Sequence, residues 1–220
     1  MEKLKNIDTV IFDLDGTLLY TLEDMVDSVN HVMAEYGFSQ HSVSAIRSFI
    51  GNGIRKLLER ALPEGSSAEL CDEATEKYRA HYQNHCMIKT QPYEGIMEML
   101  ERLADAGIKM AIVTNKNDEA SQEMQKHFFS ETIHVCYGQR NDIPKKPDRA
   151  MIDLALEKLG SLSENSVYVG DSEVDMQTAE NAGMPCITCS WGYRDREYLV
   201  EKGATILVDN PSEIAKIILK

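Results

Sequence analysis

The segment Thr9-Val10-Ile11-Phe12-Asp13-Leu14-Asp15-Gly16-Thr17 decides the fold, because a short apolar run ends in two acidic residues and a glycine turn. The apolar run predicts a buried β-strand. Residues two apart in extended chain point to the same side, so the spacing predicts that Asp13 and Asp15 face one crevice at the strand's carboxyl end. Ligands bind at that end in open α/β sheets. A simple turn, in which Asp and Gly are common, would also account for this segment taken alone.

Similar apolar runs recur along the chain, and they predict further strands. Apolar stripes with helical spacing alternate with them after Pro92, and two of these stripes are closed by Gly107 and Gly160. This alternation favours an α/β fold with a doubly wound, Rossmann-like parallel sheet that carries helices on both faces. The predicted strands are Thr9–Phe12, Ile108–Val113, Ile133–Cys136, Ser166–Val169, Cys186–Cys189 and Thr205–Val208.

The stretch from about residue 21 to residue 89 interrupts this alternation, because it contains only helical patterns. We therefore expect two domains. Residues 1–20 and 90–220 would form the α/β core, and residues 21–89 would form an inserted helical domain that lies over the end of the first strand.

The composition is that of a soluble globular protein, with 43% hydrophobic and 27% charged residues among 220. The net charge of −13 opposes any general attraction to nucleic acid or to an anionic membrane. No segment approaches the roughly 20 apolar residues that cross a bilayer, and the first residues lack the apolar core of a signal peptide. We expect a cytoplasmic protein, a monomer or weak homodimer, whose five scattered cysteines are reduced.

Two further polar segments accompany the predicted sheet. Thr114-Asn115 directly follows a strand, where a hydroxyl group and backbone N–H groups could hold phosphoryl oxygens. Lys145-Lys146-Pro147-Asp148 precedes a helix for which Asp148 is the expected N-cap, and Lys146 is placed to neutralise a bound phosphate. Ordinary turn chemistry and a solvated surface lysine are the alternatives for these two segments.

A third segment, Gly170-Asp171-Ser172-Glu173-Val174-Asp175, ends a strand and opens a helix. Asp171 and Asp175 are therefore predicted to face one pocket, although acidic residues are also common at the start of a helix. Carboxylate oxygens are the ligands that suit Mg²⁺. All of these segments lie at the carboxyl ends of strands or beside them. Four polar segments in such positions are poorly explained by coincidence.

This ordered set resembles the haloacid dehalogenase-like phosphohydrolase superfamily, whose pattern is DxDGT, then Ser or Thr, then Lys, then an acidic GDxxxD motif. The resemblance runs over essentially the whole chain, and it implies a Mg²⁺-dependent phosphatase acting on a small phosphorylated molecule. Asp13 would be the nucleophile that forms an aspartyl-phosphate, and Asp15 would be the general acid that then activates water. Thr114 and Asn115 would clamp the phosphoryl oxygens, while Lys146 would balance charge. The implied metal ligands are Asp13, the carbonyl group of Asp15, Asp171 and, in support, Asp175.

The helical insert resembles the α-helical cap of the same superfamily. Gly51-Asn52-Gly53, followed by Arg55, resembles the cap loop of the phosphoglycolate phosphatase branch, which makes 2-phosphoglycolate the favoured substrate. Gly51, Asn52 and Arg55 would then bind substrate, with the guanidinium group meeting a carboxylate. A turn between helices with a solvated arginine fits these residues equally well.

The same motifs leave further functions open. A pyrophosphatase or a β-phosphoglucomutase-like phosphomutase would use all of them. A non-enzymatic signalling module that accepts phosphate is disfavoured by the helical insert and by an aspartate pair after the first strand. Dehalogenation is disfavoured because that branch lacks the second aspartate, present here as Asp15.

Overall fold

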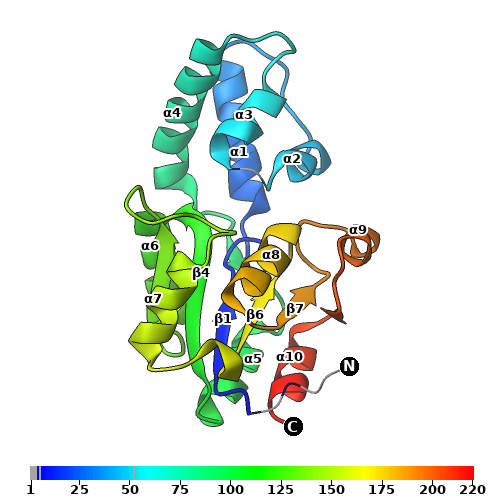
Figure 1. The fold of residues 1–220 in the computed structure, drawn as a ribbon. Coiled ribbons are helices and arrows are strands. Elements are labelled where there is room, and N and C mark those ends of the chain that lie inside the picture. Colours follow the sequence, from blue (N-terminus) through cyan, green and yellow to red (C-terminus); the bar gives the residue numbers. More distant parts are fainter. Residues whose placement is uncertain (1–3, 5, 52) are drawn as a thin grey trace. The chain divides into compact units, whose positions relative to one another are not determined.

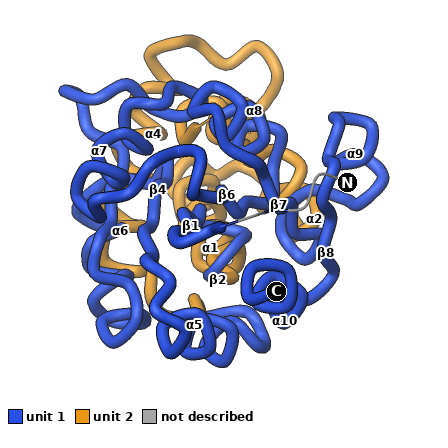
Figure 2. Tube along the Cα trace, turned by 60° about the horizontal axis from the view of Figure 1, so that its bottom comes forward, with its two compact units in different colours: residues 1–19, 92–220 blue, residues 20–91 orange. Residues whose placement is uncertain are grey.

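The computed structural model of the protein describes residues 4, 6–51 and 53–220. The chain divides into two compact units (Figure 2). Unit 1 contains Met1–Leu19 and Pro92–Lys220, and unit 2 contains Tyr20–Gln91. Unit 1 is therefore assembled from two segments of the chain, and unit 2 is one continuous insertion between them.

Unit 1 is built on a six-stranded sheet with the order β5-β4-β1-β6-β7-β8. All neighbouring strands are parallel, which confirms the fold class predicted from the sequence. The first strand of the chain therefore lies in the middle of the sheet, flanked by β4 and β6 (Figure 1). The strands are β1 (Thr9–Phe12), β4 (Lys109–Asn117), β5 (Val135–Gln139), β6 (Ser166–Gly170), β7 (Cys186–Cys189) and β8 (Ile206–Val208).

Helices cover both faces of this sheet, as Figure 2 shows for α7 and α8 on one side of the strands and α5 and α10 on the other. Apolar residues two apart along a strand share a face, so each face of a fully buried strand needs its own cover. The helices of unit 1 are α5 (Ile96–Asp105), α6 (Asp118–Phe129), α7 (Ala150–Leu159), α8 (Glu173–Ala182), α9 (Arg196–Glu201) and α10 (Pro211–Ile218), with a short 3₁₀ helix at Ser163–Asn165.

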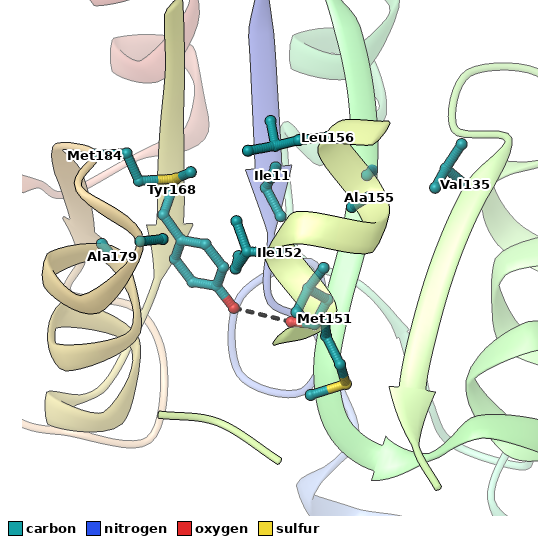
Figure 3. Close-up of a cluster of buried hydrophobic side chains, with 12 residues drawn as sticks. Ile11, Val135, Met151, Ile152, Ala155, Leu156, Tyr168, Ala179 and Met184 are labelled. Carbon is teal, nitrogen blue, oxygen red and sulfur yellow. Dashed lines mark hydrogen bonds between the residues drawn. The ribbon is translucent and has the colours of Figure 1, made fainter. Parts of the chain in front are cut away.

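The core on one face centres on Ile11, which is in register with Ala111 on β4 and Tyr168 on β6. These three residues are completely buried beneath side chains of α7 and α8, including Ile152 (Figure 3). The phenol group of Tyr168 donates a 2.8 Å hydrogen bond to the carbonyl oxygen of Val113. The only polar atom that this aromatic side chain carries into the core is thereby satisfied.

Unit 2 is helical and consists of α1 (Leu22–Glu35), α2 (Val43–Phe49), α3 (Ile54–Ala61) and α4 (Ala68–His85). Its apolar stripes are buried, as on α4, where Ala74 and Tyr78 are almost completely inaccessible. The chain passes between the units at β2 (Leu19–Tyr20) and β3 (Gln91–Pro92), which pair with each other as a two-stranded sheet. No helix in the described part of the chain is long and apolar enough to cross a membrane.

Three element boundaries differ from those predicted. β4 continues to Asn117, because its ladder with β5 resumes after a register shift beyond Val113. β5 begins at Val135, because the backbone N–H of Ile133 still bonds the end of α6. α7 begins at Ala150 with Arg149 as its N-cap, and the carboxylate of Asp148 nevertheless accepts a 2.8 Å hydrogen bond from the backbone N–H of Ala150.

Candidate active site

The register of the sheet brings the polar segments of unit 1 to one edge. Phe12, the last residue of β1, is paired with Ile112 on β4 and with Val169 on β6. Asp13 therefore lies one residue beyond the end of β1, at the level where the segments leading to Thr114 and Asp171 begin. The carboxyl ends of three adjacent strands thus deliver their polar residues to the same place.

Three carboxylates gather at this edge. Asp13, Asp171 and Asp175 each offer an oxygen, and these oxygens lie within 4.8 Å of one another. All three residues are buried, with Asp175 completely inaccessible to solvent. Three acidic groups held together away from water repel one another strongly, so this arrangement requires compensating positive charge.

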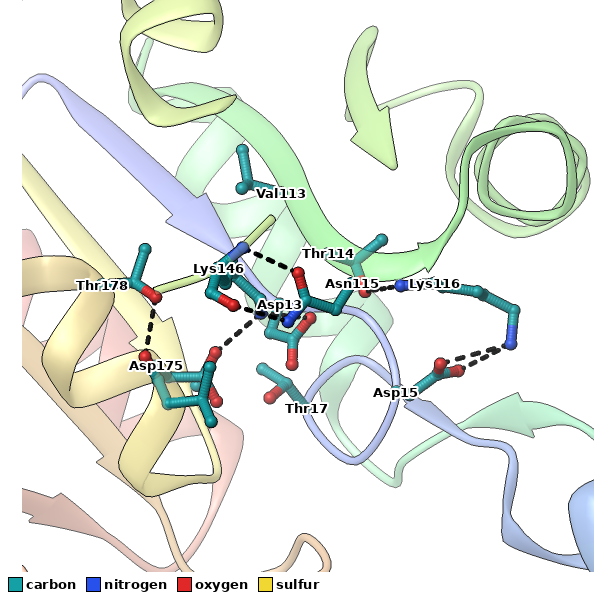
Figure 4. A network of polar contacts seen from close by, with 12 residues as sticks. Asp13, Asp15, Thr17, Val113, Thr114, Asn115, Lys116, Lys146, Asp175 and Thr178 are labelled. Carbon is teal, nitrogen blue, oxygen red and sulfur yellow. Dashed lines mark hydrogen bonds and ion pairs between the residues drawn. The ribbon is translucent and has the colours of Figure 1, made fainter. Parts of the chain in front are cut away.

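Lys146 supplies part of that compensation. Its ammonium group lies 2.9 Å from Asp13 Oδ1 and 2.8 Å from Asp175 Oδ1 (Figure 4). It also donates a 3.0 Å hydrogen bond to the hydroxyl oxygen of Tyr168. Burial, the largest influence, favours the neutral amine. The two carboxylates outweigh burial and raise the pKa of Lys146 well above its ordinary value. The side chain is therefore a fixed positive charge.

One ammonium group does not neutralise three carboxylates, and the pKa values of two of these acids are raised. Burial is the largest influence on Asp13 and raises its pKa to about 6, with Lys146 opposing the rise and Asp175 adding to it. Burial and the charges of Asp175 and Asp13 raise the pKa of Asp171 well above its ordinary value. Proteins relieve such an excess of buried negative charge with a proton or with a metal cation.

The residues present fit a metal cation. The cluster offers only oxygen ligands, which are the donors that hard cations prefer. Among the residues that the structure describes, this trio is the one group of three or more acidic, histidine or cysteine side chains close enough to share an ion. The candidate metal ligands therefore lie at the same edge of the sheet as the residues predicted to bind phosphate.

Asp175 is held by the start of α8. Its Oδ2 accepts a 2.6 Å hydrogen bond from the hydroxyl group of Ser172, and the same oxygen accepts the backbone N–H groups of Asp171 and Ser172 at 3.2 and 3.1 Å. Ser172 and Asp175 form a capping box, which fixes the first turn of the helix. One carboxylate thus caps a helix through Oδ2 and contacts Lys146 through Oδ1.

Asp171 is held by a segment whose role was not predicted from the sequence. The backbone N–H of Tyr193 donates a 2.6 Å hydrogen bond to Asp171 Oδ2, and the indole of Trp191 donates to the carbonyl oxygen of Thr17. Gly192 lies between them, where an added Cβ would be 2.3 Å from the side chain of Asp171. The available signal was a glycine between two aromatic residues directly after a predicted strand.

The carboxylate of Asp15 lies outside the buried trio. It pairs with Lys116, at 3.0 and 3.2 Å (Figure 4). β1 ends at Phe12 and the chain turns immediately after Asp13, so the common crevice of Asp13 and Asp15 that strand alternation predicted stays a prediction. Strand alternation does not apply within that turn.

The comparisons with known proteins agree with this geometry. Residues 10–189 match the family model described as haloacid dehalogenase-like hydrolase. The chain belongs to the haloacid dehalogenase-like hydrolase family. A phosphoglycolate phosphatase from Mesorhizobium japonicum is 32% identical over 191 residues, covering 85% of this chain and 84% of the relative. One from Thiobacillus denitrificans is 31% identical over 219 residues, covering 97% of this chain and 96% of the relative.

A solved structure points to the same family. The crystal structure of a Lactobacillus delbrueckii subsp. bulgaricus protein, provisionally named a phosphoglycolate phosphatase, superposes with a TM-score of 0.91. The two chains are 30% identical, and the match covers 97% of this chain and 98% of that one. The family and its relatives together indicate that this haloacid dehalogenase-like hydrolase is a phosphatase.

Thr114 and Asn115 of this haloacid dehalogenase-like hydrolase lie at the expected edge. Thr114 is almost completely buried, and its hydroxyl oxygen accepts a 3.3 Å hydrogen bond from the backbone N–H of Lys116. The Asn115 side chain accepts from the backbone N–H of Lys146 at 2.8 Å and donates to the carbonyl oxygen of Lys146 at 3.0 Å. Asn115 therefore fixes the backbone that carries the buried lysine, and its contact with substrate stays a prediction.

The predicted substrate-binding residues of the insert lie in unit 2. Gly51 is exposed, and Asn52 falls outside the described residues. Arg55, in the first turn of α3, donates a 2.7 Å hydrogen bond from Nε to Asp72 Oδ1, and its guanidinium group is also 3.8 Å from Glu59 Oε2. These pairs are exposed, so a substrate carboxylate can replace them at little energetic cost. The role of Gly51, Asn52 and Arg55 in binding substrate stays a prediction.

Proposed function

We propose that this phosphatase hydrolyses 2-phosphoglycolate in a Mg²⁺-dependent reaction. The observation that carries the proposal is the buried trio of Asp13, Asp171 and Asp175, which holds more negative charge than Lys146 neutralises. The substrate is inferred from the phosphoglycolate phosphatases to which the chain is similar over most of its length.

The residues proposed to hold Mg²⁺ are Asp13, the main-chain carbonyl group of Asp15, and Asp171, with Asp175 in support. This ion usually keeps several waters and takes few carboxylate ligands, which suits a small cluster of oxygens next to a phosphate site. When bound, it would screen the negative charges of the phosphate and of the attacking carboxylate. Its binding would also lower the pKa values that burial has raised in Asp13 and Asp171.

Asp13 is proposed to act as the nucleophile. A carboxylate oxygen of Asp13 would form a bond to phosphorus while the bond from phosphorus to the substrate's ester oxygen breaks. Asp15 would give its proton to that departing oxygen and then accept a proton from water, which attacks the phosphoryl group on Asp13 and releases inorganic phosphate. The enzyme ends the cycle with both aspartates restored.

Three neighbouring residues are proposed to orient the phosphoryl group. Thr114 would donate its hydroxyl proton to a phosphoryl oxygen, and the ammonium group of Lys146 would balance the charge that spreads over those oxygens. Asn115 would assist the same clamp. Its two hydrogen bonds to the backbone of Lys146 support at least an indirect part in that task.

Gly51, Asn52 and Arg55 are proposed to bind the carboxylate end of the substrate. A guanidinium group can bind a carboxylate through two parallel hydrogen bonds. The variant Arg55→Met should therefore raise KM for 2-phosphoglycolate about ten-fold, while leaving KM for an uncharged alkyl phosphate within about two-fold. An equal change in KM for both substrates would remove Arg55 from this role.

The decisive experiment compares substrates and nucleophile variants. With Mg²⁺ present, the protein is expected to turn over 2-phosphoglycolate with a higher kcat/KM than pyrophosphate, sugar phosphates or nucleotides. Asp13→Asn should abolish turnover and prevent transfer of a radiolabelled phosphoryl group to the protein, whereas Asp105→Asn, at an exposed position of α5, should change neither. Substantial Mg²⁺-dependent activity in Asp13→Asn would overturn the covalent mechanism.

The same panel of substrates tests the remaining candidate functions. Preference for pyrophosphate would make the enzyme a pyrophosphatase. Conversion of a labelled sugar phosphate into its isomer without release of phosphate would make it a phosphomutase. A phosphoprotein that forms once and persists, with no continuing release of phosphate, would indicate a signalling module.

A further inference from the structure

The ion pair between Lys116 and Asp15 is a second lysine–aspartate pair at the edge of the sheet in unit 1. The ammonium group of Lys116 lies 3.0 Å from Asp15 Oδ1 and 3.2 Å from Asp15 Oδ2. The side chains are only 6% and 22% exposed, respectively. A lysine side chain so far removed from water needs a charged partner, because an unpaired buried ammonium group is costly.

The backbone on both sides of this pair is fixed. Lys116 lies in the part of β4 where the register with β5 shifts, and its backbone N–H bonds the hydroxyl oxygen of Thr114. Asp15 lies in the turn after β1, where the backbone N–H of Gly16 bonds the carbonyl oxygen of Leu19. Because β1 and β4 are neighbouring parallel strands, two segments 101 residues apart in sequence are held side by side.

The pair separates the two acids of the first motif. Asp13 pairs with the ammonium group of Lys146, whereas Asp15 pairs with that of Lys116 (Figure 4). Each carboxylate therefore has its own lysine. Without Lys116, the carboxylate of Asp15 would lose the charged partner that now orients it, and it could turn to water or to the buried cluster.

We propose that Lys116 is a positioning residue that sets the orientation of the Asp15 carboxylate and thereby the protonation of the departing oxygen. This inference rests on the proposed function, in which Asp15 is the general acid. Lys116 would act through Asp15 and would not contact the phosphoryl group. Its loss should matter in proportion to how much the departing oxygen needs a proton.

The experiment compares two leaving groups. 2-Phosphoglycolate releases an alkoxide, which needs a proton, and p-nitrophenyl phosphate releases a stable phenolate, which needs little help. In Lys116→Met, kcat/KM for 2-phosphoglycolate, which reports phosphoryl transfer to Asp13 and not the later hydrolysis, should fall about 100-fold, the order expected when a reacting group is misplaced. The value of kcat/KM for p-nitrophenyl phosphate should fall less than about three-fold.

Matched variants sharpen this comparison. Asp15→Asn should show the same dependence on the leaving group, and the double variant with Lys116→Met should be no slower than Asp15→Asn alone, because both changes remove one function. Lys116→Arg should recover most of the lost rate. Lys145→Met, which removes the exposed lysine next to Lys146, should leave the turnover of both substrates unchanged.

The outcomes for Lys116 and for Asp15 are distinguishable. If Asp15→Asn discriminates between the substrates and Lys116→Met slows both equally or neither, Lys116 does not act through Asp15. A raised KM for both substrates in Lys116→Met would instead make it a direct anion ligand. If Asp15→Asn itself does not discriminate, the general acid of the proposed function is wrong. Turnover of p-nitrophenyl phosphate reports folding, and Lys116→Gln replaces Lys116→Met if the latter is insoluble.

Discussion

The backbone N–H of Tyr193 donates a 2.6 Å hydrogen bond to Asp171 Oδ2, so the segment after β7 holds the acid that follows β6. This bond stabilises the charged form of a carboxylate whose surroundings otherwise favour the neutral form. It requires close approach of the backbone, which Gly192 permits. The position of Asp171 therefore depends on a residue without a side chain.

Gly192→Ala should damage the acid cluster. The new Cβ would lie 2.3 Å from Asp171 Oδ2 and 2.5 Å from the carbonyl oxygen of Gly16, so the side chain of Asp171 or the backbone at Gly16 would have to shift. We expect a loss of about 1–3 kcal/mol in the free energy of unfolding and a 10- to 100-fold loss in Mg²⁺ affinity, measured by denaturant unfolding and calorimetry.

A second glycine provides the control for that variant. An added Cβ at Gly138 would lie 2.3 Å from the hydroxyl oxygen of Ser121 and 2.5 Å from Asp118 Cα, away from the acidic trio. Gly138→Ala should lower stability without changing Mg²⁺ affinity. Equal Mg²⁺ affinities in the two variants would show that Gly192 does not support the proposed Mg²⁺ site.

Removal of Lys146 should make folding depend on a cation. Its ammonium group contacts both Asp13 and Asp175, so Lys146→Met leaves buried carboxylates without their partner. The free energy of unfolding without metal should fall by about 3–5 kcal/mol. Saturating Mg²⁺ should restore more stability to this variant than to the wild type, as thermal melts with and without chelator would reveal. Lys145→Met is the control, and an identical Mg²⁺ response in all three proteins would contradict the expectation.

The stability of the metal-free protein should decrease as pH rises from about 4 to 6. Folding raises the pKa of Asp13 from 3.8 to about 6, so in this range the folded protein binds more protons than the unfolded chain. The contribution of Asp13 is therefore present at low pH and lost as pH rises through the folded pKa.

A comparison of variants isolates this contribution from that of the surface acids. Asp171→Asn removes a second carboxyl group whose pKa folding raises, so its unfolding free energy with chelator present should depend less on pH than that of the wild type. Urea unfolding across the pH range provides the measurement. Parallel pH profiles for the two proteins would show that the pKa of Asp171 is not raised by folding.

Asp24 should be essential to the stability of unit 2. Its carboxylate, only 2% exposed, accepts the backbone N–H groups of Ile88, Lys89 and Thr90 at 2.9–3.1 Å. Asp24→Ala should cost about 3 kcal/mol, because three backbone donors lose their acceptor.

Asp27 offers the control on the same helix. It forms an exposed ion pair with Lys89, at 2.7 Å, so Asp27→Ala should cost less than about 1 kcal/mol. Thermal unfolding of both variants tests the contrast. Similar melting temperatures would mean that the backbone hydrogen bonds to Asp24 contribute little.

The sequence was sufficient for the parallel sheet and for the convergence of Asp13, Asp171 and Asp175, because both follow from apolar runs that end in polar residues. The strands of a parallel sheet all end at the same edge, so the residues that follow them lie together whatever their side chains contact. The contacts of Asp15 could not be obtained in this way. They depend on a turn after β1 and on a register shift in β4 that brings Lys116 beside it.

The contribution of Gly192 was also beyond sequence reasoning. Its importance comes from a close approach between segments that precede and follow β7, whereas a glycine in a loop more often serves only to let the chain turn. Asn115 illustrates the same limit, since its amide group is engaged by the backbone of Lys146, 31 residues away. Residue type alone did not distinguish a ligand for substrate from a support for another residue.

The pairing of β2 with β3 has a consequence for how such a chain can diversify. Both connections to unit 2 lie next to each other, so unit 1 is interrupted at a single point in space. Adjacent ends are the condition under which one domain can be inserted into another without disturbing its host. Genetic exchange of the segment between them can therefore supply a different helical module while every acid at the strand ends keeps its place.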